Sequence, residues 1–206
     1  MSTLVSFQEP TGERSTGARC WMVVIDESSS MSSADSLGTR ADAVRATAEF
    51  LAAYGLDGDR IGETWFADDA DVTPAAPTGQ FAPSVAKHDV GSGTELTNAL
   101  TAAVDSMASS CASATPVLVL VSDGQASSQP DFDGIATLLS GRGSDVNVHL
   151  IAMNENAAFE SARGFWEDPA LGLRSITTVA GFGSAEVAAA VAGILSTETG
   201  QQVVAK

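Results

Sequence analysis

The sequence predicts an α/β protein whose mainly parallel, doubly wound sheet of about six strands carries helices on both faces. Short apolar runs alternate with segments of helical periodicity along the chain, which is the pattern of repeated strand–helix–strand units. The apolar runs are continuous rather than alternating, as expected of strands that are buried on both faces. The chain has 206 residues, of which 44% are hydrophobic, and this suits one domain with a sizeable core. We expect that domain over residues 19–197, a tail or edge strand over residues 1–18, and a tail over residues 198–206.

The first half of the chain contains two strand–helix units and a polar connection. Residues 20–25 form an apolar run that ends at Asp26 and fits a central strand. After a Ser-rich loop, apolar residues recur at helical spacing until Gly55. The expected elements are a strand over 20–25, a helix over 40–54, a strand over 60–67, an acidic turn over 68–71, a short strand near 84–86 and a helix over 95–107.

The second half continues the alternation. Residues 116–121 read Pro-Val-Leu-Val-Leu-Val, the strongest strand signal in the sequence. The expected elements are this strand, a helix over 132–139, a strand over 146–153, a helix over 159–166, a strand over 176–179 and a helix over 184–195. Ser184 is expected to cap the last helix. Phe159, Phe165 and Trp166 are expected to pack in the core rather than form an exposed patch.

The chain carries 26 acidic and 10 basic residues, a formal charge of −16. Such a surface repels phosphate backbones, which argues against nucleic acid and favours a cation or a basic protein surface as partner. The simplest role of the acid excess is solubility. No apolar stretch has the length of a membrane span, and the N-terminus lacks the features of a secretory signal. We therefore expect a cytoplasmic location and no membrane contact.

The two cysteines, Cys20 and Cys111, each lie just ahead of an expected strand. A bridge is conceivable if those strands are neighbours in the sheet. In the cytosol, two reduced thiols are the expected state. Their spacing does not match a metal site.

Oxygen-bearing side chains follow the expected strands at the edge where ligands bind in open α/β sheets. The first strand ends in Asp26, and in an extended loop Ser28 and Ser30 project to the same side as Asp26. The strand over 116–121 is followed by Asp123, and a Gly-Ser-Gly turn presents the hydroxyl of Thr94 from a third loop. We expect these five side chains to converge.

Together these side chains offer two carboxylates and three hydroxyls, with no sulfur or imidazole. Hard cations prefer such ligands, so we expect one divalent ion, Mg²⁺ first, with Mn²⁺ or Ca²⁺ as alternatives. Hydroxyl ligands leave the ion electron-poor, and an open position can then accept an Asp or Glu carboxylate from another protein. This chemistry is adhesion to a protein partner without bond breaking.

The motif Asp26-Glu27-Ser28-Ser29-Ser30 resembles the Asp-x-Ser-x-Ser motif of von Willebrand factor A (VWA) domains. Thr94 after its Gly-rich turn and Asp123 after its apolar strand match the rest of that family's metal-ion-dependent adhesion site (MIDAS) in order and spacing. The resemblance covers residues 19–197 and implies a Rossmann-like fold and a cation held by Asp26, Ser28, Ser30, Thr94 and Asp123. It also implies a protein–protein interaction module in an intracellular bacterial or archaeal assembly, stress-response or signalling system, and not an enzyme.

Two residues depart from the family pattern. Ser29 stands where the family usually has Gly. That Gly eases the backbone conformation and is not a ligand, so a metal site is still expected. Glu27 stands where a small residue is usual. We expect Glu27 to point to solvent, where it could repel an acidic ligand.

Other functions fit the residues less well. A Mg²⁺-dependent hydrolase or phosphatase of similar fold would use Asp26 as nucleophile and a second carboxylate two residues later, where the chain has Ser28. A scaffold that kept the fold without the metal is the third possibility. His149 is expected to be a hydrogen-bonded structural residue, and nothing near His88 makes it a catalytic base. The acidic residues between 57 and 71 are expected to form solvated turns: Asp57, Asp59, Asp68, Asp69 and Asp71.

Overall fold

The computed structural model describes residues 6–84, 88–111, 113–125, 129–141, 146–153, 157–179 and 183–206. Its centre is a six-stranded sheet with the strand order β3-β2-β1-β4-β5-β6. The strands are β1 (Arg19–Asp26), β2 (Arg60–Phe66), β3 (Ala70–Pro77), β4 (Thr115–Ser122), β5 (Asn147–Met153) and β6 (Ser175–Val179). All neighbours pair in parallel except β3, which pairs antiparallel with β2. The strand order reverses between β1 and β4, so the predicted doubly wound sheet is confirmed.

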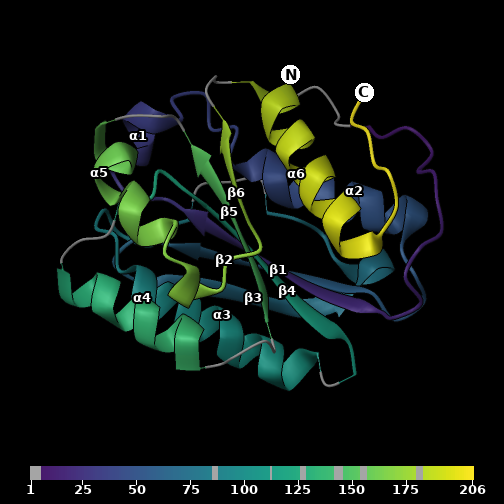
Figure 1. The fold of residues 1–206 in the computed structure, drawn as a ribbon, viewed down its shortest axis with the longest axis horizontal. Helices are drawn as coiled ribbons and strands as arrows, with labels where there is room; N and C mark the ends of the chain where they lie inside the picture. Colours follow the sequence, from purple (N-terminus) through teal and green to yellow (C-terminus); the bar gives the residue numbers. More distant parts are fainter. Residues whose placement is uncertain are drawn as a thin grey trace.

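Helices cover both faces of the sheet (Figure 1). One face carries α2 (Ala41–Tyr54) and α6 (Ser184–Thr199), and the other carries α3 (Leu96–Ser110), α4 (Gln129–Gly141) and α5 (Ala157–Trp166). A single-turn helix, α1 (Met31–Ala34), follows β1. Two short 3-10 helices cover Thr78–Gln80 and Pro169–Leu171. The long helices lie where helical spacing predicts them, with ends that differ by a few residues.

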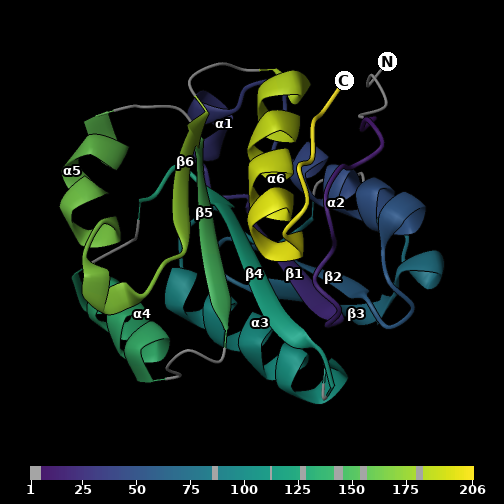
Figure 2. The ribbon, with the colours of Figure 1, turned by 45° about the vertical axis from the view of Figure 1, so that its right-hand side comes forward.

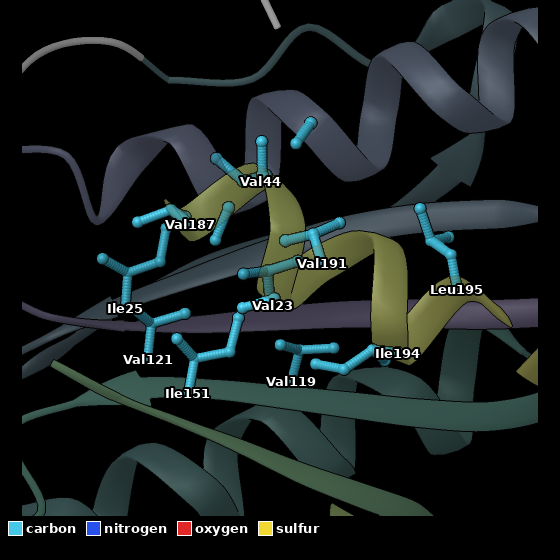
Figure 3. Packing of buried hydrophobic residues seen from close by; sticks show 14 of the residues in the cluster. Val23, Ile25, Val44, Val119, Val121, Ile151, Val187, Val191, Ile194 and Leu195 are labelled. Carbon is cyan, nitrogen blue, oxygen red and sulfur yellow. The ribbon is translucent and has the colours of Figure 1, made fainter. Parts of the chain in front are cut away.

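Each face of the sheet has its own hydrophobic layer, because successive residues of a strand point to opposite faces. Figure 3 shows side chains of the layer between the sheet and α6, among them Val23, Val119, Val121, Val187, Val191 and Ile194. The opposite layer holds residues of the alternate register, such as Met22, Leu118 and Leu150, against α3. These two buried layers explain why the strands read as continuous apolar runs.

The antiparallel strand β3 was not predicted. Its sequence, Ala-Asp-Val-Thr-Pro-Ala-Ala-Pro, reads as a Pro- and Ala-rich connection, and Pro is tolerated in sheets mainly at edges. β3 is the outermost strand beside β2, so one of its sides needs no ladder hydrogen bonds. The expected acidic turn is correspondingly shorter than 68–71. The expected short strand near 84–86 falls largely on residues outside the described ranges.

The two terminal segments run side by side (Figure 2). Isolated antiparallel bridges join Phe7 to Ala205 and Thr11 to Gln202. Phe7 is buried and meets the ring of Phe50 on α2 edge-on, with ring centroids 5.4 Å apart. The N-terminal segment therefore packs against α2 and pairs with the C-terminal segment rather than with a strand of the sheet.

The last helix begins at Ser184, and its N-cap is Gly183. The prediction that Ser184 caps this helix is therefore wrong. Ser184 is already helical, so its side chain is past the position from which a cap accepts the first free N–H groups.

Cys20 and Cys111 form a disulfide, with their Cα atoms 5.7 Å apart. The expected pair of free thiols is therefore wrong. Cys20 pairs with Pro116 across the β1–β4 ladder, and Cys111 lies just ahead of β4, so both cysteines meet at the edge where these strands begin. In the part of the chain that the structure describes, no helix has the length and apolar character needed to cross a bilayer.

Candidate metal centre

Two buried carboxylates lie at the carboxyl ends of the central strands. Asp26 is the last residue of β1, and Asp123 directly follows β4. The parallel ladder pairs Ile25 with Val121, so the two strands end at the same edge. Both aspartates are fully buried. This edge lies where the strand order reverses, which is the usual ligand position in such sheets.

The hydroxyls of Ser28 and Ser30 meet beside Asp26. Their Oγ atoms are 3.0 Å apart, and the Ser28 N–H donates to Asp26 Oδ1 at 2.8 Å. Ser30 is the N-cap residue of α1, so the chain turns into a helix directly after the motif. The loop thus gathers one carboxylate and two hydroxyls within one short stretch.

The loop that carries Thr94 packs against the loop that carries Ser28, Ser29 and Ser30, which we call the serine loop. The Ser29 N–H donates to the Ser92 carbonyl at 3.0 Å, and Thr94, two residues later, is largely buried. Asp68 orders this turn by accepting hydrogen bonds from the N–H groups of Ser92 and Gly93. These backbone hydrogen bonds lower the pKa of Asp68. A Cβ on Gly93 would clash with Asp68 Oδ1, so a larger residue there would displace the Asp68 carboxylate from this turn.

Burial raises the pKa of Asp26 to about 6. Hydrogen bonds from Ser122 and Ser28 oppose this shift, and the nearby charge of Asp123 adds to it. Within the described residues, neither Asp26 nor Asp123 forms an ion pair. Two buried carboxylates held only by neutral donors leave an excess of negative charge, because a buried anion normally needs a cationic partner.

Two residues that support these carboxylates were missed by sequence reasoning. The Ser122 hydroxyl donates to Asp26 Oδ2 at 2.7 Å. Gln125 donates from its backbone N–H and its side-chain amide to the two oxygens of Asp123. Strand register is the signal for Ser122, because it follows the residue that pairs with Ile25. Nothing in the sequence identifies Gln125.

The donor chemistry fits a hard cation. Two carboxylates and three hydroxyls supply only oxygen, as Mg²⁺ and Ca²⁺ require. Among the described residues, no group of three or more His, Cys, Asp or Glu side chains is placed to hold a metal ion. A cation at this edge would therefore depend on the hydroxyls of Ser28, Ser30 and Thr94 as much as on the aspartates.

Aromatic side chains fix the backbone after Asp123. Trp166 Nε1 donates to the Gly124 carbonyl at 2.9 Å, and a Cβ on Gly124 would lie 2.6 Å from the ring of Phe159. Gly124 also has φ +78, which favours glycine. Phe159 and Trp166 are fully buried, and Phe165 is partly buried. The prediction that these aromatics pack in the core is confirmed for Phe159 and Trp166.

Glu27 does not point to solvent, so that prediction is wrong. Its side chain is 3% exposed, and it pairs with Arg40 at 2.9 Å. Arg40 also pairs with Asp35 at 3.0 Å. The sequence shows no helical or strand spacing that links these three residues, because the loop geometry brings them together.

The remaining polar candidates have structural roles. His149 is fully buried and hydrogen bonds to Glu198 and Ser175, as expected of a structural residue. His88 stacks on Trp65 with ring centroids 4.7 Å apart. Asp59 is buried and pairs with Arg14, so the prediction of a solvated turn is wrong there. The exposed members of that acidic group are Asp57, Asp68, Asp69 and Asp71.

The sequence profile of the von Willebrand factor type A domain family matches residues 21–125, which is half of the chain. The chain belongs to this family. Domains of this family typically mediate protein–protein interaction or adhesion. No curated protein sequence matches this chain.

Solved structures share the VWA fold at low sequence identity. A D319A mutant of the PilB minor pilin from Streptococcus sanguinis is 11% identical, with a TM-score of 0.66 over 89% of this chain and 62% of that one. The pilus adhesin SpaC from Lactobacillus rhamnosus GG is 13% identical, with a TM-score of 0.65 over 90% of this chain and 30% of that one. A von Willebrand factor type A protein from Catenulispora acidiphila is 15% identical, with a TM-score of 0.60 over 88% and 43%. The VWA chain thus spans less than two thirds of each of these proteins.

Proposed function

We propose that this VWA domain is a divalent-cation-dependent protein-binding module of the MIDAS type. Asp26, Ser28, Ser30, Thr94 and Asp123 would hold one cation, Mg²⁺ first, with Mn²⁺ or Ca²⁺ as alternatives. The observation that carries this proposal is the pair of fully buried aspartates beside two hydroxyls whose Oγ atoms are 3.0 Å apart. An added cation would neutralise the excess charge there, and the oxygen donors suit a hard ion.

The bound ion would supply an electrophilic contact for a carboxylate of another protein. Ser28, Ser30 and Thr94 are neutral, so they coordinate without cancelling the positive charge of the ion. Asp26 and Asp123 together balance the formal charge of a divalent ion, and the Ser122 and Gln125 hydrogen bonds hold their oxygens in place. The partner would thus be a protein that presents an Asp or Glu side chain, and the module would bind it without turnover.

The disulfide bears on where this module works. Disulfides form and persist mainly in oxidising compartments. We therefore propose an oxidising compartment in place of the expected cytoplasm, and an adhesive or assembly role there. The shared fold with a minor pilin and a pilus adhesin is compatible with such a role.

Calorimetric titration of the chelator-treated protein with Mg²⁺, Mn²⁺ and Ca²⁺ tests the proposal. We expect one site per chain, and Thr94→Ala should weaken binding by at least about tenfold because it removes a direct ligand. Thr101→Ala is the matched control, since the Thr101 hydroxyl donates to the Thr97 carbonyl within α3, away from the proposed ligands. Absence of both heat and thermal stabilisation with all three ions would refute the metal site. Phosphate-monoester hydrolysis that Asp26→Asn abolishes would support the hydrolase alternative instead.

A further inference from the structure

Three charged side chains form a cluster next to the serine loop. Glu27 lies between the proposed ligands Asp26 and Ser28, Asp35 is the C-cap residue of α1, and Arg40 is the N-cap residue of α2. The side chains of Glu27, Asp35 and Arg40 are 3%, 0% and 12% exposed. The cluster is therefore a buried connection between the end of β1 and two helices, not a set of surface charges.

The Arg40 guanidinium joins the other two side chains. Its NH2 group donates to Glu27 Oε2 at 2.9 Å, and its NH1 group donates to Asp35 Oδ2 at 3.0 Å. Burial works to lower the pKa of Arg40, and the bonds to Glu27 and Asp35 raise it above its ordinary value. The planar guanidinium can serve two carboxylates at once, which the single ammonium of a lysine does poorly.

Asp35 links the Arg40 side chain to the backbone before α2. Its Oδ1 accepts hydrogen bonds from the N–H and the hydroxyl of Thr39, and its Oδ2 accepts from the Arg40 N–H, each at 2.8 Å. On the other side of the cluster, the Glu27 N–H donates to the Phe66 carbonyl at the end of β2, at 2.7 Å. The segment that carries Ser28 and Ser30 is thus anchored at both of its ends.

We propose that Arg40 is a positioning residue of the metal site, which holds Glu27 and Asp35 together and so fixes the serine loop between them. This inference rests on the proposed function, and it accounts for the glutamate that stands where the family usually has a small residue. Among the described residues, the hydrogen bonds and ion pairs of the Arg40 side chain go to Glu27 and Asp35 rather than to a proposed ligand, so it acts through the loop. Glu27, tied inward, also cannot compete with a partner carboxylate for the ion.

The test compares Arg40→Met with Arg45→Met. Arg45 lies in the first turns of α2, and its ion pair within the described residues is with Asp42 of the same helix. Under conditions where both variants are folded, Arg40→Met should lower the Mg²⁺ affinity by about 10–100-fold, the range found when supporting partners of metal ligands are removed. Arg45→Met should bind Mg²⁺ like the wild type. Equal affinities of the two variants would overturn the proposal.

A double variant separates positioning from a general loss of stability. If Glu27 acts on the site through Arg40, then Glu27→Gln combined with Arg40→Met should bind Mg²⁺ no more weakly than Arg40→Met alone. Independent, additive losses would overturn the proposal. If Arg40→Met does not fold, Arg40→Lys replaces it, with an intermediate loss of affinity expected because the ammonium satisfies one carboxylate at a time. Wild-type affinity in Arg40→Lys would also overturn it.

Amide hydrogen exchange in the metal-free protein tests the role of Arg40 independently of metal binding. The Ser28 and Ser29 amides are hydrogen bonded to Asp26 and Ser92. They should exchange at least about tenfold faster in Arg40→Met than in Arg45→Met, because the loop opens more easily without its anchor. Failure of the wild type to bind any cation would refute the metal site, and the exchange rates alone would then decide the role of Arg40. Equal exchange rates would refute that role.

Discussion

The two edges of the sheet hold their buried carboxylates in different ways. At the amino edge, where the strands begin, Asp59 pairs with Arg14, and Glu198 lies 3.6 Å from Arg19 and hydrogen bonds to His149. At the carboxyl edge, Asp26 and Asp123 have only neutral donors among the described residues. The disulfide also lies at the amino edge.

If the proposed function holds, this difference assigns stability to the amino edge and function to the carboxyl edge of the same sheet. At the amino edge, the buried carboxylates of Asp59 and Glu198 have arginine partners, and the disulfide links the chain there. At the carboxyl edge, Asp26 and Asp123 have no cationic partner among the described residues, and the proposed cation would pair these two buried charges. Sites of function commonly carry a cost in stability, and the rest of the fold compensates for it.

The largest expected effect comes from removing the disulfide at the amino edge. Cys20→Ala with Cys111→Ala should lower the free energy of unfolding by about 4–5 kcal/mol, the chain-entropy estimate for a loop of this length. The two cysteines are 91 residues apart in the sequence. Urea unfolding followed by circular dichroism measures the loss. The Mg²⁺ affinity of the folded variant should stay unchanged, and a weaker affinity would show that the two edges are coupled.

Most of the fold follows from the sequence because burial leaves a periodic signal. The continuous apolar runs of β1 and β4 mark strands covered on both faces, and the helical spacing in α2 and α3 marks their buried sides. Strand β3 escapes this reasoning, since an edge strand tolerates Pro74 and Pro77 and needs no continuous apolar run. The disulfide could not be predicted from the sequence either, because the sequence does not show whether the protein folds in an oxidising or a reducing compartment.

The candidate site is less predictable than the fold. The positions of Asp26 and Asp123 follow from where apolar strands end, and their shared edge follows from the parallel ladder. The inward turn of Glu27 toward Arg40 does not follow, because it depends on how the loop after β1 folds over α2. Contacts between loops leave no period in the sequence, so they become visible only in three dimensions.

A smaller effect of opposite sign is expected at the carboxyl edge. In chelator at about pH 8, Asp26→Asn should raise the free energy of unfolding by roughly 1–3 kcal/mol, because it removes a buried charge and keeps the shape of the side chain. The same variant should lose Mg²⁺ binding. Chemical denaturation measures the gain, and Asp57→Asn, an exposed site, should change stability by less than about 0.5 kcal/mol. A less stable Asp26→Asn protein would mean that neutral donors alone satisfy this carboxylate.

The smallest effect is expected for Glu198→Gln at the amino edge. Burial works to raise the pKa of Glu198, but hydrogen bonds from His149 and Asn147 lower it below its ordinary value of 4.5. The charged form therefore stabilises the fold above about pH 4.5, and this contribution is lost as the pH falls through the lower, folded-state pKa.

Glu198→Gln should accordingly be about 1 kcal/mol less stable than the wild type near neutral pH, and the gap should close in acid. Unfolding free energies measured across the acidic range test this. The comparison between the edges requires opposite signs: neutralising Glu198 destabilises, whereas neutralising Asp26 stabilises the metal-free protein. If both substitutions shift stability in the same direction, the carboxyl edge is as well paired as the amino edge and has no need of a cation.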